Sequence, residues 1–352
     1  MTAKIIAWLL PQFHPIKEND EWWGSGFTEW TQLRRWKPVY PGHQIRRPHP
    51  DIGEYSLLER SVRQRQAELA KAHGVYGFCY YHYWFSGKLL LQQPLERMLE
   101  DGQPDLPFCV SWANESWSRR WNGLDREILI DQEYGGPEEW ARHLDYLLPF
   151  FRHKNYIQVD GKPMFVVYRL GKVPEYSARF RFWEERLREA GFRGLHLVMT
   201  LGGHADNCIP LPRADAVVEF FPNRLDYRRS LMRWLETHPK MKRIILELRQ
   251  FAGPLEYDGP TVYSEVVQFP QVHPRQYRGL FAGWDNSPRV GRRARIFQRV
   301  TPEAFGRCLR TQMERTSEFV FINAWNEWAE GATLEPDDRF GYQFLETIAS
   351  LL

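Results

Sequence analysis

Short apolar segments alternate with longer segments of helical periodicity along the chain. Eight of the apolar segments predict strands, because each is brief and rich in β-branched and aromatic residues. Strands that alternate with helices in this way form βα units and a parallel sheet. The predicted strands cover residues 5–10, 77–83, 108–113, 164–168, 196–201, 216–221, 279–284 and 319–325.

Several of the intervening segments carry clear helix signals. Residues 56–74 have apolar positions at helical spacing and end in glycine, and residues 136–153 open with a proline and two glutamates in the first turn. The segment 223–276 is too long for one loop. It predicts a helix near residues 227–238 and a second helix near residues 263–268.

Polar and aromatic residues gather after the predicted strands rather than before them. "NDEWWGSGFTEW" follows the first strand, "SWANESWSRRW" the third and "GWDNSPR" the seventh. A packed core would not favour one strand end, whereas the loops after the strands form the active face of an α/β barrel. The eight units, with no linker or repeat between them, therefore predict one α/β domain over residues 1–352. We expect a single (β/α)8 TIM barrel with long βα loops that share one mouth.

The chain is rich in aromatic residues, with 15 Trp, 16 Tyr and 22 Phe. Aromatic rings with one polar edge line sites for polyhydroxylated ligands, so we expect an oligosaccharide or polysaccharide substrate. The 47 basic and 44 acidic residues give a net charge of +3 without a long block of one sign, which argues against nucleic acid as a partner. No apolar run reaches the roughly 18 residues of a membrane span. We expect a cytoplasmic protein without membrane insertion.

The cysteines and histidines offer no spacing typical of a metal site. Cys79, Cys109, Cys208 and Cys308 lie far apart and form no C-x-x-C pair, so we expect free thiols. The histidines show no ligand spacing, and the glycines form no phosphate-binding loop. The sequence predicts neither a metal nor another cofactor.

The segment "INAWNEWAEGATLEPD" places Glu327 and Glu330 three residues apart among tryptophans. One interpretation is a solvated helix start, where acids are favoured in the first turn. Alternatively, two carboxyls that share an aromatic pocket have separated pKa values, as glycoside cleavage requires. The spacing is compatible with retaining and with inverting hydrolysis. A second pairing, Glu115 with Glu327, follows an Asn-Glu pattern at two strand ends and stays open.

Four segments together resemble the WbsX-like proteins of bacterial polysaccharide gene clusters: "WLLPQFHPIKENDEWWGSGFTEW", "CVSWANESWSRRWNG", "FAGWDNSPR" and "NAWNEWAEGATLEPD". More distantly, the barrel and the final motif are similar to the glycoside hydrolase family 99 enzymes, which cleave internal α-mannosidic linkages. This similarity implies that Glu327 and Glu330 are the catalytic pair of a retaining hydrolase. It further implies that Glu327 acts as a base on the 2-hydroxyl of the substrate while Glu330 protonates the leaving oxygen.

On this basis we expect a glycoside hydrolase that cleaves an α-mannosyl or α-rhamnosyl linkage of a bacterial polysaccharide. Two alternatives remain open: a glycosyltransferase of lipopolysaccharide O-antigen biosynthesis, as many WbsX-like proteins are labelled, and a non-catalytic glycan-binding barrel. The chain has no D-x-D triplet of the kind that holds the metal of a sugar nucleotide. Ten further residues are predicted to bind the substrate, either by contacting its hydroxyl groups or by stacking on its rings: Glu29, Trp30, His82, Trp112, Asn114, Glu115, Tyr168, Glu219, Trp284 and Asp285.

Overall fold

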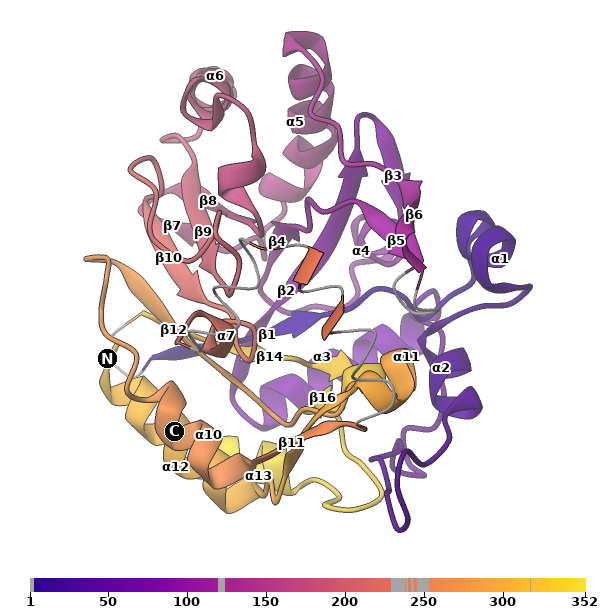
Figure 1. Ribbon diagram of the computed structural model, residues 1–352. Coiled ribbons are helices and arrows are strands. Elements are labelled where there is room, and N and C mark those ends of the chain that lie inside the picture. The colour runs from indigo at the N-terminus through magenta and orange to yellow at the C-terminus, as the bar shows by residue number, and fades with distance from the viewer. Residues whose placement is uncertain are drawn as a thin grey trace.

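The centre of the protein is a closed barrel of eight parallel strands (Figure 1). The computed structural model describes residues 3–119, 124–228, 253–316 and 318–352, together with residues 238, 240, 241, 244 and 245. The barrel strands are β1 Lys4–Leu9, β2 Val75–Phe85, β4 Phe108–Trp112, β8 Lys162–Val167, β9 His196–Leu201, β10 Ala216–Glu219, β12 Gln276–Phe281 and β14 Phe319–Asn323. The ring follows this order and closes because β1 pairs in parallel with both β2 and β14.

All eight predicted strands are present, and the predicted TIM barrel is confirmed. The strands are covered on both faces; Ile5 of β1 and Phe165 of β8, for example, have no exposed surface. Parallel strands that are buried on both faces appear in a sequence as continuous apolar runs. Several strands end earlier than predicted, so that residues 282–284 and 324–325 already belong to loops.

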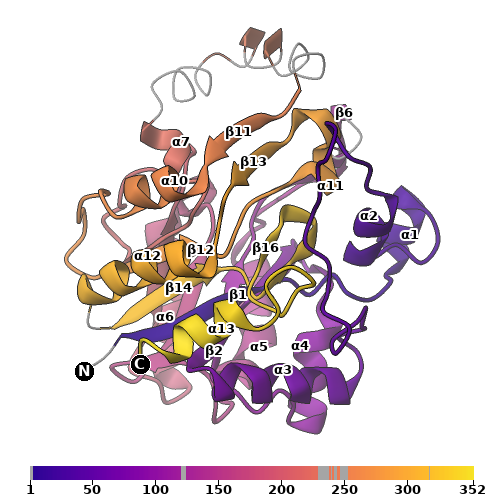
Figure 2. The ribbon, with the colours of Figure 1, turned by 90° about the horizontal axis from the view of Figure 1, so that it is seen from below.

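Helices cover the outside of the barrel (Figures 1 and 2). They are α3 Arg60–Ala72, α4 Gln93–Asp101, α5 Pro137–Phe151, α6 Tyr176–Glu189, α10 Gly259–Val266, α12 Pro302–Glu314 and α13 Gln343–Ala349. Helices α3 and α5 confirm the predictions for residues 56–74 and 136–153, and α10 overlaps the helix predicted near residues 263–268. The helix predicted near residues 227–238 lies almost entirely outside the described residues.

Additional elements occupy the segments that follow the barrel strands, in agreement with the predicted long βα loops. After β1 come α1 Lys17–Trp23 and α2 Glu29–Arg35. After β2 comes β3 Lys88–Leu90, and after β4 the antiparallel pair β5 Trp117–Arg119 and β6 Leu124–Ile130. Later segments contain η2 Leu170–Lys172, α7 Leu225–Arg228, β11 Leu255–Asp258, α11 Ser287–Val290, η3 Gly291–Arg293, β13 Arg295–Gln298, β15 Asn326–Glu327, η4 Trp328–Glu330 and β16 Ala332–Thr333. On the opposite rim, β7 Gln158–Val159 forms a hairpin with β8.

Strands β10 and β12 approach each other closely at Gly279. A Cβ atom at this position would lie 2.0 Å from the backbone oxygen of Glu219. That distance is far inside van der Waals contact, so a residue with a side chain would push the two strands apart. The closed ring therefore depends on glycine here.

The structure also bears on the cysteines and on membranes. Cys79, Cys109, Cys208 and Cys308 are free thiols, and all but Cys208 are buried. Within the described ranges, no helix combines the length and the apolar character that crossing a bilayer would need.

Candidate active site

A cavity of about 500 Å³ opens at the C-terminal ends of the barrel strands. Its lining comes from all eight strands or the segments that follow them, because parallel strands in a closed barrel end at the same rim. The volume falls within the range of about 300 to 1,000 Å³ that is typical of small-molecule sites. The polar and aromatic side chains of the lining include Gln12, Tyr81, Tyr83, Glu115, Trp117, Tyr168, His204, Asn223, Asp226, Asn286, Arg289, Glu327 and Glu330.

Glu327 and Glu330 reach this cavity from the segment behind β14. Glu327 ends the short strand β15, which pairs with β16, and Glu330 ends the single 3₁₀ turn η4. Glu327 directly precedes the turn and Glu330 is its last residue, and the side chains of both residues line the same cavity. Gly331, with a φ of 62°, ends the turn in the left-handed conformation that glycine adopts without strain.

Arg289 of α11 joins the two carboxylates. Its Nη2 donates to Oε2 of Glu327 at 2.7 Å, and its Nη1 donates to Oε1 of Glu330 at 2.6 Å. The same Nη2 lies 3.0 Å from Oε1 of Glu29, a fully buried residue of α2. Oε1 of Glu29 also accepts a 2.8 Å hydrogen bond from the backbone N–H of Ala329. One guanidinium thus contacts three carboxylates.

Burial raises the pKa of both cavity glutamates. The pKa of Glu327 rises from 4.5 to about 8, mainly because its carboxyl is shielded from water; the positive charge of Arg289 opposes this rise, and the charges of Glu330 and Glu29 add to it. The pKa of Glu330 is raised by the same burial, again against the effect of Arg289. Near neutral pH the pair therefore retains a proton that two exposed glutamates would lose.

Three tyrosines supply neutral hydroxyl groups around the glutamates. Burial raises the pKa of Tyr81, Tyr83 and Tyr168 above that of a free phenol, so each remains protonated. The hydroxyl of Tyr168 accepts a 3.2 Å hydrogen bond from the side-chain amide of Asn223. Its own proton is therefore available for an acceptor in the cavity.

Glu115 forms part of an ion-paired wall. Arg169 donates through Nη1 to Glu115 and through Nε, at 2.9 Å, to both carboxylate oxygens of Asp206. Asn114 fixes this arginine, because its side chain accepts from the backbone N–H of Arg169 at 2.8 Å and donates to the backbone oxygen at 3.0 Å. Glu115, the alternative catalytic residue, is thus paired with the guanidinium of Arg169 rather than with Arg289.

Four of the twelve predicted site residues line the cavity: Glu115, Tyr168, Glu327 and Glu330. Two others lie directly behind the lining, where Glu29 contacts Arg289 and Asn114 supports Arg169. The remaining six lie elsewhere.

The predicted stacking residues Trp30 and Trp112 belong to the core. Trp30 is 3% exposed and donates through Nε1 to the backbone oxygen of Tyr55 at 2.7 Å. Trp112 is 1% exposed and donates to the backbone oxygen of Trp84 at 3.1 Å. Neither ring lines the cavity, because each is buried between the barrel and the elements that cover it.

His82 and Glu219 are buried as well. Successive side chains of a strand point to opposite faces, so Tyr81 and Tyr83 face the cavity while His82 faces α5, where its Nε2 lies 2.9 Å from Nε2 of His143. Glu219 is held between strands by Arg278 at 3.2 Å and by other core hydrogen-bond donors. Both residues serve the packing of the barrel.

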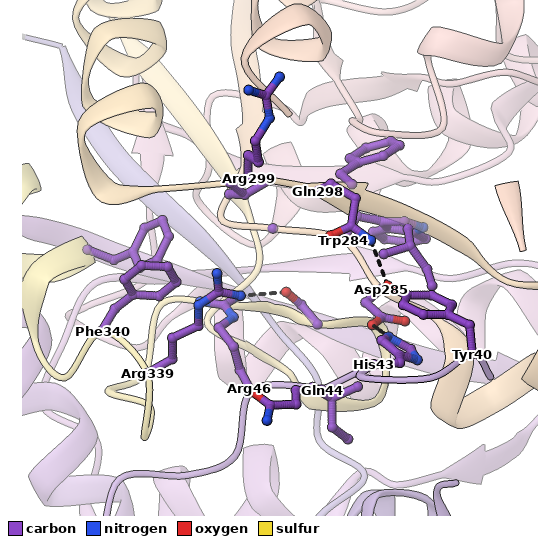
Figure 3. A pocket seen from close by; sticks show the side chains of 17 residues that line it. Tyr40, His43, Gln44, Arg46, Trp284, Asp285, Gln298, Arg299, Arg339 and Phe340 are labelled. Carbon is purple, nitrogen blue, oxygen red and sulfur yellow. Dashed lines mark hydrogen bonds and ion pairs between the residues drawn. The ribbon is translucent and has the colours of Figure 1, made fainter. Parts of the chain in front are cut away.

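Trp284 and Asp285 line a neighbouring pocket of about 70 Å³, which Figure 3 shows. Asp285 accepts a 2.7 Å hydrogen bond from Nε2 of His43, while Arg46 lies across the pocket. The backbone N–H of Asp285 donates to the backbone oxygen of Glu330 at 2.7 Å. This pocket therefore backs onto the glutamate motif without opening into its cavity.

The sequence reasoning missed Arg289, Tyr81 and Tyr83. Arg289 ends the quoted segment "FAGWDNSPR", which was noted for its acid and its tryptophan rather than for its cation. The strict alternation of side chains along β2 was the available signal for the two tyrosines. No short-range signal connects Arg289 with Glu29, because 260 positions separate them.

A family model described as "Glycosyltransferase WbsX" matches residues 5–348. The chain belongs to the WbsX family. Among its relatives, the WxcX proteins of two Xanthomonas campestris pv. campestris strains are 38% and 37% identical to this WbsX chain over 362 aligned positions. The alignments cover 100% of the chain and 50% of each relative, so the chain spans about half the length of these curated relatives.

Solved structures share the fold of this WbsX protein. A "Glycoside hydrolase-like protein" aligns with a TM-score of 0.58 at 12% identity, over 99% of this chain and 94% of its own. The GH99 endo-α-mannosidase of Bacteroides thetaiotaomicron aligns with a TM-score of 0.55 at 13% identity, over 99% of this chain and 96% of its own. The predicted resemblance is confirmed, and at these identities it shows a common fold.

Proposed function

We propose that the protein is a glycoside hydrolase that cleaves an α-mannosyl or α-rhamnosyl linkage of a bacterial polysaccharide with retention of configuration. The observation that carries this proposal is the pair Glu327 and Glu330, which lie in one sugar-sized cavity with raised pKa values and a shared arginine. A barrel that only binds a glycan does not need two buried carboxyl groups, and burying both of them is energetically unfavourable. Glycoside cleavage, in contrast, requires one protonated and one ionised carboxyl.

The two glutamates divide the proton transfers between them. Glu327 removes the proton of the 2-hydroxyl of the substrate, and the resulting oxygen attacks the anomeric carbon. Glu330 gives its proton to the departing glycosidic oxygen, so a 1,2-anhydro sugar and the first product form. Water then opens the anhydro ring as Glu330 accepts a proton from it and Glu327 returns a proton to O2, which restores both carboxyls.

The surroundings of the pair suit these roles. The pKa of Glu327 is about 8, so near neutral pH only the ionised fraction of its carboxyl acts as the base, and the positive charge of Arg289 favours that ionised form. Arg289 engages one oxygen of each carboxylate, Oε2 of Glu327 and Oε1 of Glu330. The second oxygen of each can face the substrate while the guanidinium keeps the pair in position.

The sugar configuration follows from the chemistry of this route. O2 must attack from the face opposite the leaving oxygen, so the two must be trans. An α-mannoside and an α-rhamnoside satisfy this condition, whereas an α-glucoside does not. Tyr81, Tyr83 and Tyr168 provide neutral hydroxyl groups for the remaining sugar oxygens.

Product analysis tests the proposal. Incubation with α-mannans, α-rhamnans and O-antigen polysaccharides should release fragments that initially keep the α configuration, as judged by NMR. Glu327→Gln and Glu330→Gln should each lower kcat by about 10²-fold to 10⁴-fold, the usual contribution of general acid–base catalysis. Glu185→Gln, on the exposed face of α6, is the matched control and should be unaffected. Cleavage by Glu327→Gln at the wild-type rate, or cleavage confined to α-glucosides or 2-deoxy sugars, would contradict the mechanism.

A glycosyltransferase is the second candidate, and the family description "Glycosyltransferase WbsX" is the observation that favours it. A transferase should be stabilised by its sugar nucleotide, by about 2.7 kcal/mol at a ligand concentration one hundred times Kd. Thermal-shift titration with nucleotide sugars measures this directly. Stabilisation by a sugar nucleotide, together with no hydrolysis of any glycan, would favour the transferase over the hydrolase.

A further inference from the structure

A second recess lies across the loop 284–290 from the catalytic cavity. Residues 284 and 285 of this loop line the recess, whereas residues 286, 289 and 290 line the cavity. The recess consists of an outer groove of about 650 Å³ and the pocket of about 70 Å³ in Figure 3, and both are lined by Tyr40, Gln44, Ile45, Gln298 and Arg339. We call the whole recess the Tyr40 groove. The residues of its outer part that matter here are Trp36, Tyr40, Gln44, Arg47, Gln298 and Arg339.

The aromatic wall of the Tyr40 groove is held rigidly. The hydroxyl of Tyr40 accepts a 2.6 Å hydrogen bond from Nε2 of Gln298, and its ring stacks on His43 with a centroid distance of 4.5 Å. His43 is in turn fixed by Asp285 at 2.7 Å. Three segments far apart in the sequence therefore position one half-buried ring, and such preorganisation lowers the entropic cost of binding.

The inner pocket is lined by Arg46, whose hydrogen bonds are satisfied by the protein, and by Trp284, whose indole N–H is not satisfied within the described part of the chain. Arg46 pairs with Asp337 at 3.0 Å and donates to the backbone oxygens of Ala282 and Gly331 at 3.0 and 2.6 Å. Trp284 is 6% exposed, and its indole N–H has no hydrogen-bond partner among the residues that the structure describes. A buried donor without a partner is costly, so a water or a ligand oxygen within its reach would be favoured.

The lining of the outer groove matches a polyhydroxylated ligand. The rings of Trp36 and Tyr40 are half-buried, as are rings that pack on the C–H face of a sugar. Gln44 is exposed beside them, and Arg47 and Arg339 are exposed at the edges, where each can donate to hydroxyl oxygens. The outer groove is large enough for sugar rings, whereas a pocket of about 70 Å³ admits a substituent or a few waters.

We propose that the Tyr40 groove binds a stretch of the polysaccharide that lies several units away from the bond being cut. The identity of this ligand rests on the proposed function. A long substrate would occupy both the cavity and the groove, and the second contact raises its effective concentration at the cavity. A short oligosaccharide fills the cavity alone and gains nothing from the groove.

Kinetics on matched substrates tests the proposal. Tyr40→Ala removes the stacking ring, and Gln44→Trp fills the groove from an exposed position where folding is not at risk. Both variants should lower kcat/KM on the polymer by about tenfold, the effect of losing one aromatic contact, and leave kcat/KM on a short fragment of the same polymer unchanged. An equal fall on both substrates, or no fall on the polymer with Gln44→Trp, would overturn the proposal.

Affinity electrophoresis separates this proposal from the hydrolase proposal. Gels that contain α-mannan or α-rhamnan should retard the Glu327→Gln variant, and addition of Gln44→Trp should weaken the retardation, because only the cavity then binds the polymer. Retardation that depends on Gln44 without cleavage by the wild type would keep the groove and reject the hydrolase. Cleavage by the wild type with retardation by neither polymer, or with retardation that Gln44→Trp leaves intact, would reject the groove and keep the hydrolase.

Discussion

Replacement of Glu29 by glutamine removes one of the three carboxyl groups around Arg289 and keeps the shape of the side chain. The amide oxygen can still accept from the backbone N–H of Ala329 and from Arg289, as Oε1 of Glu29 does. We therefore expect the variant to fold. Its effect should appear in the titration of the cavity glutamates, because Glu29 raises the pKa of both.

The magnitude follows from the distances around Nη2 of Arg289. This nitrogen lies 3.0 Å from Glu29 and 2.7 Å from Glu327. The two carboxylate oxygens are therefore at most about 6 Å apart, and two unit charges at that distance repel each other by about 3 kcal/mol at an effective dielectric constant of about 20. This energy corresponds to about 2 pKa units, and partial compensation by the guanidinium reduces the expected shift to about 1 to 2 units.

The dependence of kcat/KM on pH measures the shift. Glu29→Gln should move the limb governed by Glu327 to lower pH by about 1 to 2 units. The limb governed by Glu330 should move in the same direction, because Glu29 raises the pKa of both carboxyls. Activity near pH 8 should fall as the acid becomes ionised, while activity near pH 5 is retained or rises. Glu185→Gln is the matched control and should keep the wild-type profile. A profile that stays in place with an unchanged melting temperature, or that moves to higher pH, would refute the electrostatic reasoning.

Three further predictions concern the same centre and the barrel around it. The folded-state pKa of Glu327, about 8, exceeds the unfolded value of 4.5. The free energy of unfolding of the wild type should therefore fall by up to about 1.4 kcal/mol per pH unit as the pH rises over this interval. Glu327→Gln should not show this fall, so the melting temperatures of the two proteins should diverge between pH 5 and 8. Arg289→Ala removes the cation that lowers both carboxyl pKa values, so its pH profile should move to higher pH, opposite to that of Glu29→Gln. Gly279→Ala places a Cβ atom 2.0 Å from the backbone oxygen of Glu219 and should lower the free energy of unfolding by about 3 kcal/mol or more in urea titrations.

The fold was predictable because its signals are local. A strand that is buried on both faces shows itself as a short apolar run, and eight such runs, each followed by polar and aromatic loops, leave little choice of architecture. The ends of the strands were less predictable. Residues 324–325 continue the apolar run of β14 but lie beyond its end. The ring of Trp325 packs against Phe78 of β2 at a centroid distance of 4.8 Å, and its indole N–H donates to Glu335 at 3.1 Å.

The site was only partly predictable, because the choice among polar residues depends on the direction of each side chain. Glu327 and Glu330 were predicted from their spacing among tryptophans and from the family resemblance, and both line the cavity. His82 was predicted and Tyr81 was not, although the two are adjacent in sequence and point to opposite sides of β2. Glu219 was chosen for its position at a strand end, yet its neighbours Arg278 and Gln276 come from another strand and hold it in the core.

The closure of the barrel through β1 has a consequence for folding during synthesis on the ribosome. One edge of β1 pairs with β2 early, but its other edge waits for β14, which is made roughly 300 residues later. At about 5 to 20 residues per second, that edge stays open for about 15 to 60 seconds. An open strand edge invites pairing with other chains. Because Glu29 and Arg289 meet Glu327 only when β14 closes the ring, a nascent chain cannot assemble this centre until β14 and the residues directly behind it have emerged.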